Sequence, residues 1–329
     1  MAHSVYTWIK QGLIKPQNQQ QAMELADERP SRSNWLVFSH QFLLLVGLLS
    51  LAFGLIFFFA YNWNELSRMT KFLLVQAVLL ATFVLYFFKA KSFWLSQSLL
   101  LTAALLIGAL LALFGQTYQT GADPWQLFAT WAMLLLPLVL FSRSEVLWLV
   151  LASLLNLALL LYLKINPSIF GLMFDGGNEI WSFLILNVAL LVLLEGLHGK
   201  HGQWAKMLQP TYRWAAQVLG VVALFVLSAI GMEGIWGDSD QRGANLLMFV
   251  LLMGCGFAFY RFVRQDLLLL TAWALAMMVF ILSFLGHSTF RHLDASGFLL
   301  MAITLIGMSA WTVKWIKQLH VQFSQENQS

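Results

Sequence analysis

The stretch QSLLLTAALLIGALLALFG, residues 97–115, decides the fold class of this 329-residue chain. It contains no charged side chain and is close to the roughly 20 residues that a helix needs to cross a bilayer core of about 30 Å. Similar runs recur along the whole chain, which is 60% hydrophobic and 10% charged and has a mean hydropathy of +0.74. Soluble proteins carry about 25% charged residues, so this composition cannot build a water-exposed surface. We therefore predict an all-α, polytopic bundle of membrane helices.

Ten spans are expected, with tryptophans at many of their ends, where an aromatic belt belongs. A short helical element, residues 1–33, precedes the transmembrane domain of residues 34–320, and residues 321–329 form a tail. In the first element, Gly12 is expected to end one short helix and Pro16 to open another. The expected spans are residues 42–61, 71–88, 97–115, 125–141, 145–163, 180–198, 212–231, 245–260, 267–286 and 296–316.

The distribution of Lys and Arg predicts the orientation of the spans. If the N-terminus is cytoplasmic, most of the 19 Lys and Arg residues fall in inner segments, as the positive-inside rule requires. Ten spans then place both termini in the cytoplasm. The net charge of +4 is small and no basic block is present, so we expect no nucleic-acid partner. The one cysteine, Cys255, excludes an intrachain disulfide.

The stretch FGQTYQTGADPWQLF, residues 114–128, joins the third and fourth spans on the expected outer side. Gly121 frees the backbone for the turn, and Pro124 needs no N–H donor at the start of a helix. The carboxylate of Asp123 is expected to cap this helix by accepting from its first N–H groups. Asn245 is expected to open the eighth span in the same way. The matched spacing of residues 115–123 and 237–245 indicates either shared capping chemistry or a worn internal repeat.

Turn chemistry does not explain all the polar residues of this stretch. Amide and hydroxyl groups beside a tryptophan are what a site for a polar ligand would use, and the neighbouring outer loop contains the similar stretch YNWNE, residues 61–65. The alternatives are a well-built turn or a ligand-binding site. The candidate ligand-binding residues are Gln116, Tyr118, Gln119, Asp123, Trp125, Asn62, Trp63 and Glu65.

Two segments carry a family resemblance. FGLIFFFAYNWNELSRMTKFLLVQ, residues 53–76, and FGQTYQTGADPWQLFATWAMLLLPL, residues 114–138, resemble a bacterial family of predicted inner-membrane proteins, domain of unknown function 2157. The resemblance covers residues 4–170 best. It implies a multi-pass protein of the bacterial cytoplasmic membrane and carries no assigned chemistry.

Catalytic and metal-binding signatures are weak. The sequence has no Walker loop, no H-E-x-x-H and no G-x-S-x-G motif. Glu195, His198 and His201 have a spacing that could serve a metal, but the glycines around the two histidines favour a flexible loop. A second group in the last outer loop comprises His287, His292 and Asp294. We predict no catalytic residue, metal site or cofactor.

Two kinds of helix contact are expected inside the membrane. Asn156 and Asn187 lie at equal depth in the fifth and sixth spans, so their amides can hydrogen-bond across this hairpin. We interpret them as a structural polar pair, with a substrate contact as the alternative. Close helix packing is expected at the small residues Gly47, Ser50 and Gly54 of the first span, and at residues 254–256 of the eighth.

Three classes of function fit these features. A non-catalytic accessory, scaffold or sensory component of the cell envelope would use residues 1–33 to dock a protein partner. A transporter or lipid-handling protein would use the polar outer loops, with membrane lipids as partners. A membrane-embedded enzyme acting on an envelope lipid would need an outer acid or histidine, and its candidates are Glu65, Asp123, His287, His292 and Asp294.

Overall fold

The computed structural model describes residues 5–10, 12–25, 32–61, 67–89, 92–119, 121–165, 179–198, 212–237, 242–289 and 295–326. These residues contain ten helices that are long and apolar enough to cross a membrane. The prediction of an all-α bundle with ten spans is thus confirmed, and each expected span overlaps one helix. The chain divides into two compact units, residues 1–121 and 122–329, which are described separately.

The first unit begins with the expected pair of short helices. Gly12 has a φ of +69° and donates to the Ile9 carbonyl, which ends the first helix as predicted. Pro16 opens the next turn. The elements of this unit are α1 (Val5–Lys10), η1 (Pro16–Asn18), α2 (Gln19–Leu25), α3 (Arg32–Tyr61), α4 (Arg68–Lys89) and α5 (Phe93–Tyr118).

Helix α5 organises the membrane helices of the first unit, because α3 and α4 both pack against it. Ser92 caps its start, accepting from the Leu95 N–H at 3.2 Å, and Val75 of α4 and Leu113 of α5 are buried together. The expected close packing of α3 through Gly47 and Gly54 is not found: a Cβ on either glycine would meet no described atom within 4 Å.

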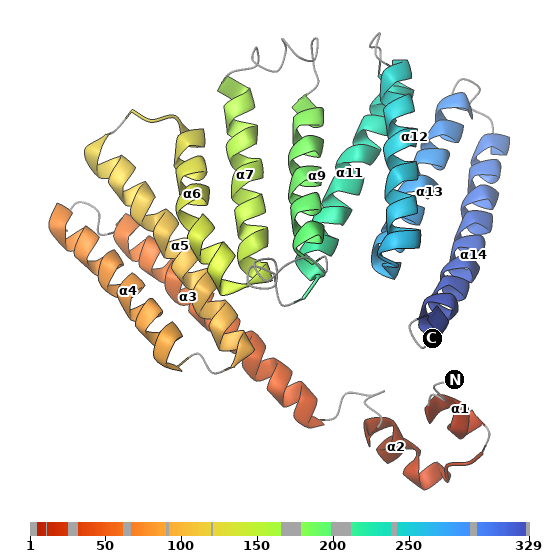
Figure 1. The fold of residues 1–329 in the computed structure, drawn as a ribbon, viewed down its shortest axis with the longest axis horizontal. Coiled ribbons are helices and arrows are strands. Elements are labelled where there is room, and N and C mark those ends of the chain that lie inside the picture. The colour runs from red at the N-terminus through yellow and green to blue at the C-terminus, as the bar shows by residue number, and fades with distance from the viewer. Residues whose placement is uncertain are drawn as a thin grey trace. The chain divides into compact units, whose positions relative to one another are not determined.

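The second unit is a row of helices, running from yellow to blue in Figure 1. Helix α11 contacts four others, namely α7, α9, α12 and α13. The elements of this unit are α6 (Pro124–Ser142), α7 (Glu145–Ile165), α9 (Glu179–Leu197), α11 (Trp214–Trp236), α12 (Arg242–Ala258), η2 (Phe259–Val263), α13 (Leu267–Thr289) and α14 (Ala295–Glu326).

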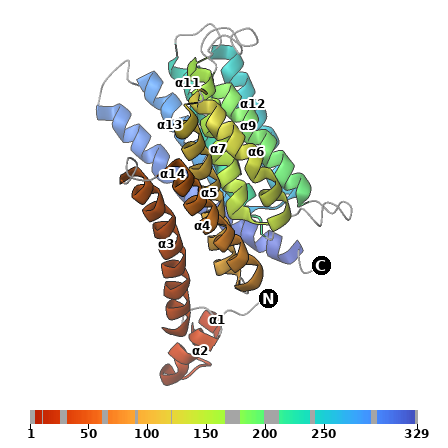
Figure 2. The same cartoon turned by 90° about the vertical axis from the view of Figure 1, so that its left-hand side faces the viewer.

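Small residues explain the central position of α11, which packs on α7, α9, α12 and α13; the turned view of Figure 2 looks along this row of helices. A Cβ on Gly231 would lie 2.7 Å from the Phe249 ring of α12, and one on Gly220 would lie 2.6 Å from Leu269 of α13. Helix backbones approach closely where side chains are absent. The close contacts of this unit therefore lie at these glycines, and the prediction that residues 254–256 make them is wrong: a Cβ on Gly254 or Gly256 would meet no described atom within 4 Å.

Helix α12 ends in a wider turn. The Arg264 N–H donates to the Phe259 carbonyl, five residues back, and residues 259–263 form a π-helix. The π-turn holds more backbone per turn than an α-helix and is frequent at functional sites. It carries Tyr260 and leads to Arg264 and Asp266, which belong to the charged cluster described next.

Candidate functional site

The predicted ligand-binding residues at the end of α5 are exposed. Gln116 and Tyr118 lie on the last turn of the helix, and Gln119 ends it with a φ of 47°. The Tyr118 ring packs against Phe114, with ring centroids 4.8 Å apart. Gly121 has a φ of +64°, the freedom that the turn was expected to need.

Asp123 and Trp125 belong to the second unit. Asp123 occupies the cap position of α6, but its side chain makes no capping hydrogen bond, and its backbone carbonyl accepts from Gln126 instead. The prediction that its carboxylate caps the helix is therefore wrong. Trp125 packs edge-on against Tyr162, with centroids 5.0 Å apart.

The remaining candidates of that ligand site, Asn62, Trp63 and Glu65, lie outside the described residues, so the site stays a prediction. Asn245 was also expected to cap a helix. It lies inside α12, which begins at Arg242, and only 2% of it is exposed. The capping prediction is wrong there because the helix begins three residues earlier.

The two amides at mid-helix do meet. Asn156 Nδ2 donates to Asn187 Oδ1 at 3.2 Å, and Asn187 Nδ2 donates to Asn156 Oδ1 at 2.8 Å. Each amide also donates to the carbonyl four residues before it in its own helix. The exchange leaves each side-chain oxygen with a partner, as a buried polar group requires.

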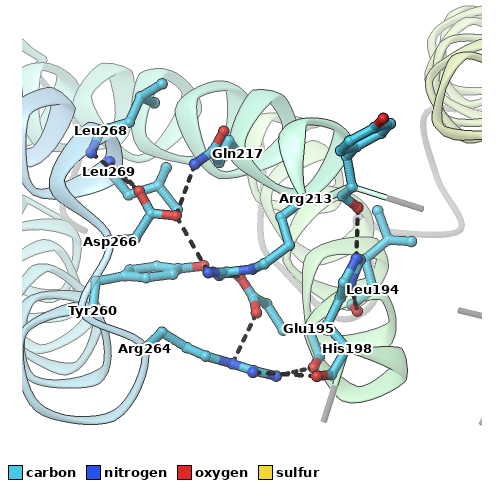
Figure 3. Close-up of polar contacts among 11 residues, drawn as sticks. Leu194, Glu195, His198, Arg213, Gln217, Tyr260, Arg264, Asp266, Leu268 and Leu269 are labelled. Atoms are coloured by element: carbon cyan, nitrogen blue, oxygen red, sulfur yellow. Dashed lines mark hydrogen bonds and ion pairs between the residues drawn. The ribbon is translucent and has the colours of Figure 1, made fainter. Parts of the chain in front are cut away.

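Among the described residues, a concentration of charge lies elsewhere, at the end of the second unit where α9 ends and α11 and α13 begin (Figure 3). We call it the charged cluster. Glu195 on the last turn of α9 is 4% exposed, and its carboxylate lies 2.8 Å from Arg213 and 3.0 Å from Arg264. The Tyr260 hydroxyl lies 3.5 Å from Glu195 Oε1. The charged cluster comprises Glu195, Arg213, Arg264 and Asp266, with Gln217, Tyr260 and His198 around them.

The Asp266 side chain caps the start of α13. Its Oδ1 accepts from the backbone N–H groups of Leu268 and Leu269, which is how an aspartate caps a helix. Its Oδ2 accepts from Gln217 at 2.9 Å and lies 3.7 Å from Arg213. The carboxylate thus ties the start of α13 to the start of α11.

The Arg264 side chain bonds the C-terminal end of α9. Its guanidinium donates to the backbone carbonyls of Glu195 and His198 while it pairs with the Glu195 carboxylate. Carbonyls in the last turn of a helix have no partner in that helix and carry its negative dipole end. A cation that bonds them therefore fixes this end of α9 on the turn that follows η2.

His198 is held in place rather than free to bind a metal. Its Nδ1 lies 2.8 Å from the Leu194 carbonyl oxygen and its Nε2 lies 2.7 Å from the Tyr212 carbonyl oxygen. Both ring nitrogens are therefore directed at the backbone, and the expectation of a flexible loop is wrong at His198. His201 lies outside the described residues. His287 packs against the Trp236 ring, with centroids 4.9 Å apart, and His292 and Asp294 are not described.

An apolar pocket of about 660 Å³ adjoins the charged cluster. Helices α9, α11, α12 and α13 and the turn η2 line it, and its lining ranges from Leu184 to Gly196 on α9 and from Leu252 to Arg264 along α12 and η2. The twelve residue steps from Leu184 to Gly196 rise about 18 Å along α9. Among its lining side chains, only Glu195, Tyr260 and Arg264 carry a charge or a hydroxyl group, and all three lie at one end.

Small residues make room for this pocket. Gly196 of α9 and Gly256 of α12 line it, and a Cβ on either would meet no described atom within 4 Å. Cys255 also lines the pocket and is exposed. Gly256 and Cys255 were expected to pack α12 closely against another helix, but they line a space between helices instead.

Sequence reasoning missed this site, although it contained a signal. Glu195 drew attention only as a metal ligand with His198 and His201. Arg213, Arg264 and Asp266 stand at ends of spans on the same expected side of the membrane, so their charges could have been matched with Glu195. The pocket itself left no such signal in the sequence, because leucine and valine occur both in pocket linings and on surfaces that face lipid.

The comparisons with known proteins bear on the first part of the chain. Neither a curated protein nor a solved structure matches the chain. Residues 6–148 match the model of the family described as "Predicted membrane protein (DUF2157)", so the resemblance expected from the sequence is confirmed over that range.

Proposed function

We propose that this membrane protein is a lipid-handling protein that holds an acyl chain in the apolar pocket of its second unit. One observation carries the proposal: a space lined by apolar side chains ends at a group of hydrogen-bonded charges, of which the Glu195 carboxylate is buried. An amphiphile has the same division between an apolar body and a polar end. Ligand sites are typically apolar clefts of about 300–1,000 Å³ with a few placed polar groups.

The dimensions of the pocket support a chain from one leaflet. A leaflet contributes about half of the 30 Å hydrocarbon core, roughly 15 Å. The pocket extends about 18 Å along α9. Its polar end coincides with the end of this helix, which is the depth at which a headgroup would lie.

Exposed lining residues support entry from the side. Val192 of α9 and Val263 of η2 are 64% and 67% exposed although both line the pocket. Helices α9 and α12 both pack on α11, and the two exposed valines lie on α9 and on the turn that follows α12. A lipid could therefore enter from the bilayer without passing through water.

Filling the pocket tests the proposal. Gly256→Leu places a side chain into the space, whereas Gly254→Leu adds the same bulk to the same helix at a residue that does not line the pocket. We expect lipid that co-purifies with the protein, measured by native mass spectrometry, to be lost from Gly256→Leu and retained by Gly254→Leu. Equal retention by both variants would refute the proposal.

Cys255 provides a second readout, since it is the one cysteine of the chain and lines the pocket. A bound chain would shield its thiol. We expect a small thiol reagent to modify Cys255 faster in delipidated protein than in protein reconstituted with lipid. Identical rates would count against occupancy.

For the location of the protein, we propose the bacterial cytoplasmic membrane with the charged cluster on the cytoplasmic side. Among the described residues of the second unit, this end carries Arg143, Arg261, Lys314 and Lys317 in addition to the charged cluster. The positive-inside rule places such an end in the cytoplasm. A reporter enzyme active only outside the cytoplasm, fused after residue 329, should be inactive, and an active fusion would reverse the orientation.

The accessory hypothesis is supported by one feature of the first unit. Trp8 and Leu13 are 41% and 69% exposed, so the N-terminal element presents apolar side chains that a protein partner could cover. Deletion of residues 1–33 should then release a co-purifying protein while leaving the pocket lipid bound. A co-purified protein unaffected by the deletion would remove this alternative.

A further inference from the structure

Arg264 is the one basic side chain among the described residues that line the apolar pocket. Resting on the proposed lipid-handling function, we infer that Arg264 selects an anionic phospholipid: its guanidinium binds the headgroup phosphate and disfavours a headgroup that also carries a cation. The inference depends on three observations: the balance of charge around Glu195, the donors that Arg264 still has, and its place at the mouth of the pocket.

The charges of the cluster balance, with Glu195 and Asp266 opposite Arg213 and Arg264, but they are not equally close to the pocket. The Glu195 carboxylate has two guanidiniums as neighbours, Arg213 at 2.8 Å and Arg264 at 3.0 Å. Asp266 adds a second carboxylate, but it accepts from backbone N–H groups of α13 and lies 3.7 Å from Arg213. Arg213 is thus shared between two carboxylates and does not line the pocket, whereas Arg264 does. An anionic group in the pocket would therefore meet Arg264.

Arg264 has donors left for a phosphate. A guanidinium carries five N–H groups in a planar fork. Nε faces Glu195, and the two terminal nitrogens each donate to one backbone carbonyl, of Glu195 and of His198. Each terminal nitrogen therefore retains one N–H group without a described partner. Arginine forms paired hydrogen bonds with phosphate in this manner.

The position of Arg264 suits a headgroup. Its side chain is 23% exposed, whereas that of Glu195 is 5% exposed, so the cation is the more accessible member of the pair. It follows the last turn of a membrane helix, at the level where headgroups lie, and basic residues near this level attract anionic lipids. An acyl chain in the pocket would bring its own phosphate to this point.

The chain offers a matched control. Arg261 lies on the same turn, but it bonds Gln322 at 2.9 Å and lies over the Phe323 ring, and it does not line the pocket. Arg261→Gln removes the same charge from the same region as Arg264→Gln. Any general attraction of this basic end for anionic lipids falls with both substitutions, whereas recognition at the pocket falls only with the second.

The experiment reconstitutes the full chain in nanodiscs with equal amounts of dioleoyl phosphatidylglycerol and dioleoyl phosphatidylcholine, which differ only in the headgroup. Native mass spectrometry after release measures which lipid stays bound. Both lipids carry the phosphate, but phosphatidylcholine also carries a quaternary ammonium that the Arg264 guanidinium repels, so we expect about tenfold enrichment of phosphatidylglycerol. Arg264→Gln should abolish this preference and Arg261→Gln should keep it.

The outcomes separate this inference from the function on which it rests. Equal binding of both lipids overturns the headgroup inference and leaves the lipid-handling function standing. Binding of neither lipid overturns both. Loss of the preference in Arg261→Gln as well overturns the role of Arg264. If Arg264→Gln does not fold, Arg264→Lys keeps the charge but not the fork, and its enrichment should fall to about threefold; an undiminished preference overturns recognition by the guanidinium.

Discussion

Arg264 binds Glu195 twice, through the carboxylate and through the backbone carbonyl of the same residue. The first contact neutralises a buried charge, and the second occupies a carbonyl at the end of α9. Because both come from one guanidinium, the charge and the end of its helix are held together. The end of the apolar pocket is thereby fixed on α9 and on the turn after η2.

Removing the charge of Glu195 should destabilise the second unit. Glu195→Gln leaves Arg213 and Arg264 without their shared counter-charge. We expect the free energy of unfolding to fall by about 2 kcal/mol, less than the 3–5 kcal/mol typical of a fully buried pair, because both guanidiniums remain partly exposed. Unfolding in detergent measures the change. Glu179→Gln at the exposed start of α9 is the control, and an equal loss there would contradict the assigned role.

The paired amides of Asn156 and Asn187 should be coupled. Alanine at either position removes both shared hydrogen bonds, so the double variant should lose less stability than the sum of the single ones. The expected coupling is about 0.6–2 kcal/mol, the range for hydrogen bonds between membrane helices. A double-mutant cycle on thermal unfolding in detergent measures it. Additive losses would show that the two amides contribute independently.

Gly231 should tolerate no side chain. A Cβ there would lie 2.7 Å from the ring of Phe249, which is 1% exposed and stacks on the Phe280 ring. We expect Gly231→Ala to cost about 1–3 kcal/mol through overpacking. Gly307→Ala, where a Cβ meets no described atom within 4 Å, should be neutral or gain up to about 1 kcal/mol from helix propensity. If the two variants unfold alike, α11 and α12 do not pack as closely as described.

Two helix starts should respond differently to alanine. Ser92 accepts from the Leu95 N–H, so Ser92→Ala should cost about 1 kcal/mol. The Asp123 side chain makes no capping bond, so Asp123→Ala should change stability by less than about 0.5 kcal/mol. Thermal unfolding of both variants provides the comparison. A large loss at Asp123 would restore the capping role expected from its position beside Pro124.

Features that depend on composition and spacing along one helix could be predicted from the sequence. Apolar length identified all ten spans, and equal depth in a hairpin placed Asn156 opposite Asn187. Gly12 and Gly121 were expected at turns because only a backbone without a Cβ adopts positive φ at little cost, and both do so.

Features that depend on which helices become neighbours could not be predicted. Gly254 and Gly256 have the composition of a packing face, but close approach occurs at Gly220 and Gly231 because α11 is the central helix. Glu195 and Arg264 are 69 residues apart, and no local spacing rule relates them. The caps at Asp123 and Asn245 failed for a smaller reason, since a cap depends on a rotamer and on a helix boundary that moves by a few residues.

The length of the π-turn, residues 259–263, determines where Arg264 lies at the charged end of the pocket. One residue fewer in this turn would restore a plain α-helix and rotate the chain beyond it by about 100°. Arg264 would then swing away from Glu195, while Cys255 and Gly256 would keep their places on α12. Among related chains, a single-codon insertion or deletion could therefore switch the ligand class of the pocket while its apolar body is inherited unchanged.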